Sequence, residues 1–247
     1  MSKPPAALRL DRLLANLGYG SRRDVQALVG AGRVLLDGVP VTEADGRIAL
    51  APDLPDRMTV RGRPLDPLPG LILMLNKPLG MTCSHKEAGP LVYSVLPERW
   101  RRRDPAISTV GRLDKETSGL LLLTDDGGLL HRIISPKSNV PKRYVATLDR
   151  PLRGDEAALF ASGTMLLDGE EKPLLPAELE VLEPKLARLT IHEGRYHQVR
   201  RMFAAAGNHV VELHRDRMGG LDLPADLEPG QYRLLTPADI AAIFAGG

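Results

Sequence analysis

The sequence contains a single cysteine, Cys83, among its 247 residues. One cysteine excludes an internal disulfide and is typical of a protein from a reducing compartment. The six histidines do not follow the Cys/His spacing of a zinc site, so we expect no metal. No apolar run approaches the length of a membrane span, and the start, MSKPPAALRL, lacks the apolar core of a signal peptide. These absences predict a soluble, cytoplasmic protein without a membrane partner.

The sequence also lacks a strong net charge, because its formal value is only +2. Bulk charge therefore does not indicate a nucleic-acid partner, yet the basic residues cluster, and local clusters can bind phosphates in a nearly neutral protein. For any one cluster, a solvated surface is the commoner explanation. The clusters are Arg22-Arg23, the run RWRRR at 99–103, and Arg200-Arg201.

Residues 8–65 have the pattern of a small separate domain. The stretch LRLDRLLANLG places leucines at helical spacing and ends on Gly18, and Ser21 is a suitable N-cap for a second helix, SRRDVQALVGAG. Asp37-Gly38 in RVLLDGVPV predicts a β-hairpin. The order resembles that of the S4 RNA-binding domain. This resemblance implies RNA contacts by five arginines: Arg9, Arg12, Arg22, Arg23 and Arg33.

A boundary is expected in RGRPLDPLPG, residues 61–70, because three prolines prevent a continuous helix or a central strand. Residues 66–70 would then form a flexible linker to a second domain at 71–247. Strand-like runs such as GLLLLT and KRYVATL mix there with helical patterns, without regular alternation. An α+β class is therefore more consistent with the sequence than a doubly wound one.

Three aspartates lie in the segment GRLDKETSGLLLLTDDGG, residues 111–128. Asp125 and Asp126 join an apolar strand to a helical pattern, so we expect them to cap free backbone N–H groups. Asp114 precedes no such pattern. On local chemistry alone it is more often a turn former than a catalyst, and the two alternatives stay open.

Segments along nearly the whole chain resemble the pseudouridine synthases that modify bacterial ribosomal RNA. The family implies a mixed, largely antiparallel central sheet with flanking helices and loops, an S4 domain ahead of it, and no cofactor or metal. The matching segments are MLNKPLGMTCS at 74–84, GRLDKETSGLLLLTDDG at 111–127, SPKSNVPKRYVATL at 135–148 and HEGRYHQVRRMFAAAGNHVVELHRDRMGG at 192–220.

The resemblance assigns Asp114 as the essential aspartate of a reaction that breaks the bond between uracil N1 and ribose C1′ and joins C5 to C1′. It implies that Arg200 pairs with this carboxylate, in agreement with its position beside the apolar stripe of a predicted helix. Tyr144 would pack against the target base. Arg112 would hold the flipped nucleotide, whose removal from the stack costs a few kcal/mol.

Four further residues are candidates for shaping the cleft or contacting RNA. Asn76 and Lys77 would form the edge of the cleft, although a turn that ends a strand is an equal explanation. His197 would orient its helix or contact RNA. Arg201 lies one step further round the helix than Arg200, so it would contact solvent or phosphate.

HQVRRMFAAAGNHVVELHRDRMGG is most similar to the group that acts on the small subunit, the RsuA group, which implies a uridine of 16S rRNA in free rRNA or an assembly particle, bound by a monomer. A large-subunit (23S) rRNA enzyme of the same group is the alternative. A non-catalytic S4 RNA-binding protein would not need Asp114, Tyr144 and Arg200 together. An S4-bearing methyltransferase would need a strand-glycine-helix fingerprint that the sequence lacks.

Overall fold

A computed structural model describes residues 6–84 and 89–245, and over them the chain forms two compact units. The first unit holds the chain up to Ile72 together with Leu96–Ser108 and Thr124–Asp126. The second unit holds Leu73–Val95, Thr109–Leu123 and the chain from Gly127 onward. Two later segments thus fold with the N-terminal part of the chain.

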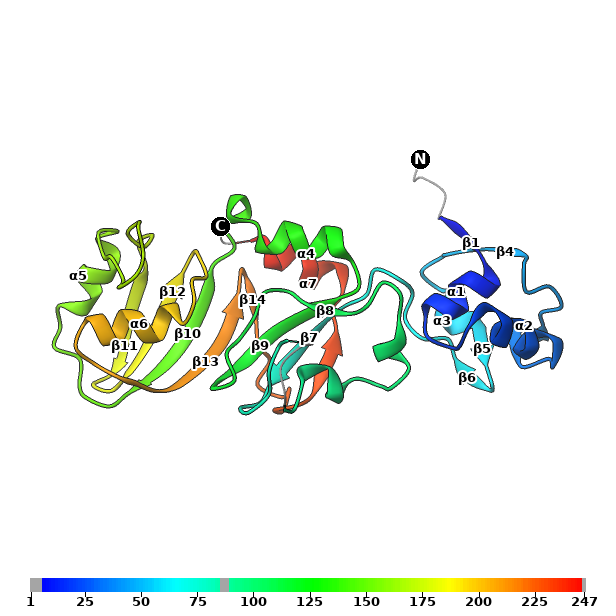
Figure 1. Ribbon diagram of the computed structural model, residues 1–247, viewed down its shortest axis with the longest axis horizontal. Coiled ribbons are helices and arrows are strands. Elements are labelled where there is room, and N and C mark those ends of the chain that lie inside the picture. Colours follow the sequence, from blue (N-terminus) through cyan, green and yellow to red (C-terminus); the bar gives the residue numbers. More distant parts are fainter. Residues whose placement is uncertain (1–5, 85–88, 246–247) are drawn as a thin grey trace. The chain divides into compact units, whose positions relative to one another are not determined.

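The first unit contains two short helices, α1 (Leu10–Asn16) and α2 (Arg22–Gly30) (Figure 1). Ser21 caps α2, and its side chain and that of Asp24 form a reciprocal capping box. Both predicted helices are confirmed. Their apolar residues share one core: Leu10, Leu13, Leu14, Leu17, Val25, Leu28 and Val29.

Short strands complete this unit. Asp37 and Gly38 adopt positive φ values of 52° and 80°, as a type I′ turn requires, and confirm the predicted hairpin between β2 and β3. The four-stranded sheet has the order β3-β2-β5-β6, with β2 at Val34–Leu36, β3 at Val39–Pro40, β5 at Met58–Val60 and β6 at Arg63–Pro64. Outside it lie β1 (Ala7–Arg9), which pairs with β4 (Arg47–Ala49), and α3 (Leu54–Arg57).

A long sheet forms the second unit, in the order β11-β12-β10-β13-β9-β7-β15 (Figure 1). Strand β13 runs antiparallel to β10 but parallel to β9, so the sheet is mixed. The strands are β7 (Ile72–Lys77), β8 (Ser108–Thr109), β9 (Thr117–Thr124), β10 (Lys142–Leu148), β11 (Glu178–Glu183), β12 (Leu186–Ile191), β13 (Val210–Met218), β14 (Leu221–Asp222) and β15 (Tyr232–Leu234).

Helices flank this sheet, which confirms the α+β class. The ring of Phe160 on α5 packs edge-on against Phe203 on α6 at 5.3 Å, and Arg132 on α4 lies over Phe244, just beyond α7. The four helices are α4 (Gly127–Ile134), α5 (Glu156–Ala161), α6 (Gln198–Ala205) and α7 (Pro237–Ile243). Within the described ranges, no helix combines the length and the apolar character needed to cross a bilayer.

Residues 66–70 were expected to form a flexible linker. They instead belong to the first unit, where hydrogen bonds hold them in place. Asp66 pairs with Arg99, and Arg103 donates to the carbonyl oxygens of Pro67 and Leu68 at 2.9 and 3.2 Å. The run RWRRR is therefore partly a structural support, because Trp100 and Arg103 are also buried. The division into domains at 8–65 and 71–247 stays a prediction.

Asp125 is not a helix cap. Its carboxylate pairs with Arg103 at 2.8 Å, with both side chains almost fully buried, and accepts the N–H of Gly70 at 2.8 Å. The cap prediction is wrong for Asp125 because a buried guanidinium from a distant segment takes the carboxylate. A local pattern does not reveal such a partner.

Candidate active site

A cleft of about 750 Å³ opens in the second unit, between the loop before β9, strands β10 and β13, and the start of α6. Asp114, Tyr144 and Arg200, the three predicted catalytic residues, all line it. Arg112 and His197 line it as well. These residues come from separate segments of the sequence, so only the fold brings them together.

Asp114 lies in the loop that leads into β9. Its carbonyl oxygen accepts the N–H of Thr117 at 3.0 Å, which closes a turn, and its side chain is about one-third exposed. The preceding residue, Leu113, is buried and is held at both its N–H and its carbonyl oxygen by the Cys83 thiol. Burial raises the pKa of that thiol, so it stays protonated. The backbone on both sides of Asp114 is therefore fixed by hydrogen bonds.

His197 is a basic partner of Asp114. Its Nε2 lies 3.3 Å from Asp114 Oδ1. His197 adopts a left-handed backbone, with φ at 48°, at the start of α6, and its ring stacks on Tyr196 at 3.9 Å. The Tyr196 side chain is 75% exposed at the rim of the cleft. His197 was predicted to orient its helix or contact RNA. The structure shows that it also contacts the Asp114 carboxylate directly.

The expected pairing of Arg200 with Asp114 needs correction. Arg200 donates instead to the carbonyl oxygens of Glu116 at 2.7 Å and Val210 at 2.9 Å. A guanidinium fork can serve two acceptors at once. Arg200 thereby ties α6 and β13 to the loop that carries Asp114.

Tyr144 lies on β10 with its side chain buried, and its hydroxyl is 3.4 Å from Nη1 of Arg215. Arg215, on β13, also lines the cleft and is only 2% exposed. The sequence reading missed this arginine. A signal was present, because Arg215 stands two residues after the buried Leu213 in a predicted strand and so belongs to the same face.

Lys142 is a second missed residue of the cleft. Burial, and then the charge of Arg215, lower the pKa of its amine to about 8. Its Nζ donates to the carbonyl oxygen of Val140 at 3.0 Å. Lys142 precedes Tyr144 by two positions on β10, so both face the same side of the sheet. The cleft therefore has two basic residues at its floor.

Asn76 and Lys77 end strand β7 and are buried, at 7% and 0% exposure. Asn76 donates to the carbonyl oxygen of Leu227 at 2.7 Å, and Lys77 donates to that of Thr117 at 2.8 Å. Burial lowers the pKa of Lys77. Their predicted contact with RNA needs correction, since both side chains are buried and bound to main-chain carbonyls: Lys77 supports the start of β9, and Asn76 supports the segment before β15.

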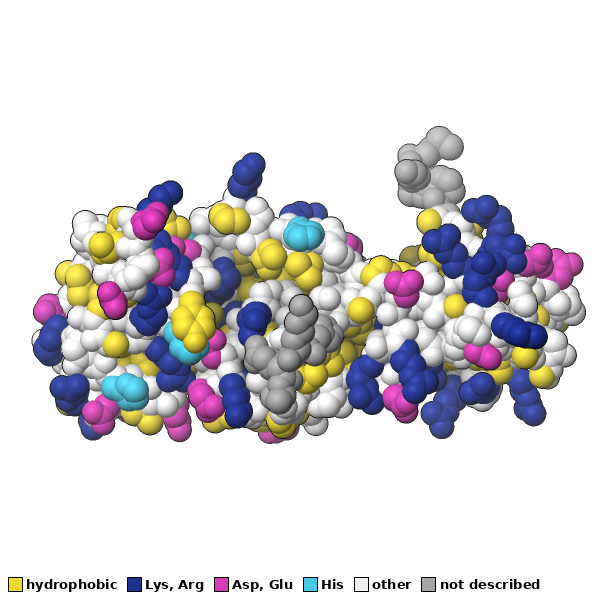
Figure 2. Space-filling model, viewed as in Figure 1, with side chains coloured by type: hydrophobic (Ala, Val, Ile, Leu, Met, Phe, Trp, Pro, Cys, Tyr) yellow, Lys and Arg dark blue, Asp and Glu magenta, His cyan; other side chains and the backbone are white. Residues whose placement is uncertain are grey.

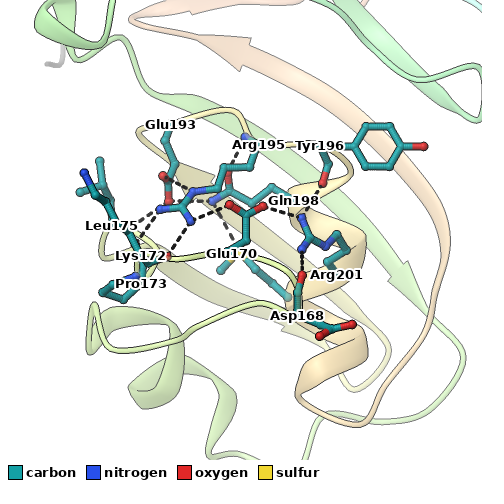
Figure 3. A network of polar contacts seen from close by, with 11 residues as sticks. Asp168, Glu170, Lys172, Pro173, Leu175, Glu193, Arg195, Tyr196, Gln198 and Arg201 are labelled. Carbon is teal, nitrogen blue, oxygen red and sulfur yellow. Dashed lines mark hydrogen bonds and ion pairs between the residues drawn. The ribbon is translucent and has the colours of Figure 1, made fainter.

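Arg201 belongs to a network of polar contacts rather than to open solvent (Figure 3). It pairs with Glu170 at 2.9 Å and donates to the Tyr196 carbonyl oxygen at 3.2 Å. Arg195 takes the other oxygen of Glu170 at 3.1 Å and pairs with Glu193 at 3.0 Å. The two arginines, Arg201 first, lower the pKa of Glu170. This network fastens residues 168–175 to the segment that carries His197 and Arg200.

The five arginines predicted for the S4-like part fall into two groups. Arg9 and Arg22 both pair with the fully buried Asp11, at 3.0 and 2.9 Å. The remaining three are exposed, and none makes an ion pair within the part of the chain that the structure describes: Arg12, Arg23 and Arg33. Basic side chains gather over the first unit in Figure 2. Only the second group therefore leaves its guanidinium groups without an ion pair among the described residues.

Comparison with known families decides the class of this protein. Residues 71–205, more than half of the chain, match the model of the RNA pseudouridylate synthases. This chain belongs to the RNA pseudouridylate synthase family. Residues 8–47 match the S4 domain. The predicted family, its fold with an S4 domain, and the predicted enzyme class are thereby confirmed.

Curated relatives match this pseudouridylate synthase over nearly its full length. It is 44% identical over 240 residues to "Ribosomal small subunit pseudouridine synthase A" of Yersinia pestis, covering 96% of this chain and 99% of that protein. It is 39% identical to "Uncharacterized RNA pseudouridine synthase YtzG" of Bacillus subtilis, covering 94% and 97%. A solved structure described as a pseudouridylate synthase superimposes with a TM-score of 0.67 at 38% identity, covering 96% and 99%.

Proposed function

We propose that this protein converts a uridine of small-subunit ribosomal RNA to pseudouridine in the cytoplasm, acting as a monomer. The observation that carries the proposal is the 44% identity, over 96% of the chain, to enzymes named for the ribosomal small subunit, in Yersinia pestis and in Escherichia coli K12. The cleft of this chain supports it, because Asp114 and Tyr144 line the same space.

Asp114 is the residue that we assign to the sugar. A carboxylate suits an electron-poor ribose carbon, either by attack at C1′ or by removal of a sugar proton. His197, 3.3 Å away, supports the carboxylate, and Arg200 holds its loop through the Glu116 carbonyl oxygen. The target uridine must leave its stack to reach this point, and Arg112, exposed at the cleft, holds the extruded nucleotide.

Tyr144 is the residue that we assign to the base. Its ring forms part of the cleft wall and its hydroxyl is available as an acceptor for the C5 proton of the uracil. Arg12, Arg23 and Arg33 in the first unit bind phosphates of the same RNA. The affinity would then fall with salt, as counterion release requires.

The test compares two ribosomal RNAs. Incubation with small-subunit rRNA, followed by carbodiimide mapping, should reveal one new pseudouridine, and large-subunit rRNA should show none. Asp114→Asn should abolish the signal. Glu116→Gln is the matched control, because Glu116 is exposed in the same loop and its side chain does not line the cleft. Modification of large-subunit rRNA alone, or an active Asp114→Asn variant, would overturn the proposal.

A further inference from the structure

Arg215 is a buried arginine beneath the tyrosine of the cleft. Its Nε donates to the Leu120 carbonyl oxygen at 2.7 Å, and its Nη1 donates to the Tyr144 hydroxyl at 3.4 Å. Its guanidinium also lies 5.9 Å from the centre of the Tyr144 ring. Its Nη2 is buried and has no hydrogen-bond partner within the described residues.

The local fold brings Arg215 to this place. Gly119, with φ at 103°, lies against the backbone of Arg215, and a Cβ there would be 2.2 Å from the Arg215 carbonyl oxygen. Only glycine permits this close approach of β9 and β13. A register shift between β10 and β13 then sets Tyr144 opposite Arg215, while Arg143 stays opposite Arg217. Such a bulge re-aims the side chains around it.

The environment of Arg215 is unfavourable for stability alone. No carboxylate pairs with its guanidinium in the described part of the chain, although a buried charge normally requires a partner. The unpaired Nη2 adds a further unfavourable contribution, because a buried donor without an acceptor loses its hydration. An apolar side chain of similar volume would fill the space without either cost. A role in the cleft accounts for the arginine better than packing does.

A guanidinium donates hydrogen bonds and accepts none, so the Tyr144 oxygen must be the acceptor in this contact. The hydroxyl hydrogen of Tyr144 then points away from Arg215. The contact is long at 3.4 Å, as is common for catalytic hydrogen bonds before substrate binds.

We propose that Arg215 is the positioning residue for Tyr144: it fixes the direction of the phenol hydroxyl that removes the C5 proton of the target uracil. The inference rests on the proposed function. In the reaction, the N1–C1′ bond breaks and its electron pair leaves with the base. C5 then supplies an electron pair to C1′. The Tyr144 oxygen takes the proton from C5, and its hydroxyl proton passes to N1, so the phenol is regenerated and the product is an isomer of the substrate.

The test is a double-mutant cycle on small-subunit rRNA under single-turnover conditions. Arg215→Met should lower the rate about 10- to 100-fold, as expected for loss of one charge-assisted hydrogen bond, with little change in RNA affinity. In the Tyr144→Phe background, the same substitution should change the rate by less than about 3-fold, because Arg215 acts through the missing hydroxyl. A structural role would give the same loss in both backgrounds.

A second readout separates positioning from packing. With rRNA that carries deuterium at uridine C5, Arg215→Met should show a larger isotope effect than wild type, since proton removal becomes slower than the other steps. Arg217→Met is the matched control, because this arginine lies on the same strand but pairs with the exposed Asp222 outside the cleft. It should leave the rate and the isotope effect unchanged.

Arg215→Lys keeps the charge but lacks the planar guanidinium. If Arg215→Met does not fold, Arg215→Lys can replace it in the double-mutant cycle with Tyr144→Phe. Additive losses in the cycle, or an unchanged isotope effect, would overturn the role of Arg215. Absence of pseudouridine in rRNA treated with wild type would instead overturn the proposed function. The two failures are therefore distinguishable.

Discussion

Lys142 lies in the cleft beside Arg215, and burial there lowers the pKa of its amine from 10.5 to about 8. Between these two pH values the folded protein binds fewer protons at this site than the unfolded chain does. The free energy of unfolding therefore gains a contribution that rises with pH across that window.

We expect this contribution to be visible in urea unfolding of wild type and Lys142→Met at pH 7 and at pH 10. The stability of wild type relative to the variant should increase at the higher pH, since methionine has no proton to lose. Other titrating groups are common to both proteins and cancel. A difference that stays constant or reverses would mean that the amine is not buried in solution.

Arg22 and Arg23 are neighbours with different surroundings, so they offer a matched pair. Arg22 pairs with Asp11, whose pKa falls to about 2 because of hydrogen bonds from Arg9 and Arg22, whereas Arg23 is exposed without an ion pair in the described ranges. Arg22→Gln should lower the free energy of unfolding by about 1 kcal/mol. Arg23→Gln should leave it within error. Equal thermal midpoints for the two variants would show that the Asp11 pair contributes nothing.

At the scale of elements, the network around Glu170 holds the segment before α6 in place. Glu170→Gln replaces an ionic acceptor of Arg195 and Arg201 by a neutral amide, so the segment that carries His197 should become more mobile. We expect a moderate loss of the single-turnover rate, about tenfold, because charged hydrogen bonds are worth about 1.5–3 kcal/mol. We expect no global unfolding, because Arg195 keeps three other hydrogen bonds and Arg201 keeps two.

Hydrogen exchange provides the measurement for this element. Amides of residues 193–198 should exchange faster in Glu170→Gln than in wild type. Glu171→Gln is the control, since Glu171 is exposed and makes no ion pair within the residues described. A variant with faster exchange but wild-type rate would show that order in this segment does not limit catalysis.

Several helices and the hairpin could be predicted from the sequence. The helices α1, α2 and α6 follow from the helical spacing of apolar residues, and the hairpin follows from Asp37-Gly38. Each of these depends on contacts close in the chain. Family resemblance identified the fold and placed Asp114 and Tyr144 in segments that line one cleft.

Other features depend on contacts between distant segments and were not predictable. Asp125 looked like a helix cap, but its partner Arg103 comes from a segment 22 residues earlier. Tyr144 lies opposite Arg215 because of a register shift between β10 and β13, and a strand pattern alone does not reveal a shift. Arg200 was assigned to Asp114 by analogy, whereas two main-chain carbonyls take its guanidinium.

At the scale of the whole molecule, Arg12, Arg23 and Arg33 belong to the first unit and the cleft belongs to the second. Replacing Arg12, Arg23 and Arg33 together by glutamine should therefore raise KM for rRNA and leave kcat nearly unchanged. The logarithm of affinity should also depend less steeply on the logarithm of salt concentration, by about 0.7–0.9 for each lost phosphate contact. Asp114→Asn should do the opposite and abolish kcat with little effect on affinity.

A deletion of residues 1–65 tests the same separation of roles more severely. It removes all three exposed arginines, but it also removes Tyr19, on whose ring Arg99 lies at 4.4 Å. The residues that line the cleft all belong to the second unit and stay within the remaining chain, so the cleft should still form. We expect the circular dichroism spectrum to be that of a folded protein and KM for rRNA to rise strongly. The affinity for rRNA should depend on salt as weakly as that of the triple variant. If the deleted protein binds small-subunit rRNA as tightly as wild type at every salt concentration, the first unit is not the RNA-binding part, and the phosphate contacts must come from the cleft and its rim.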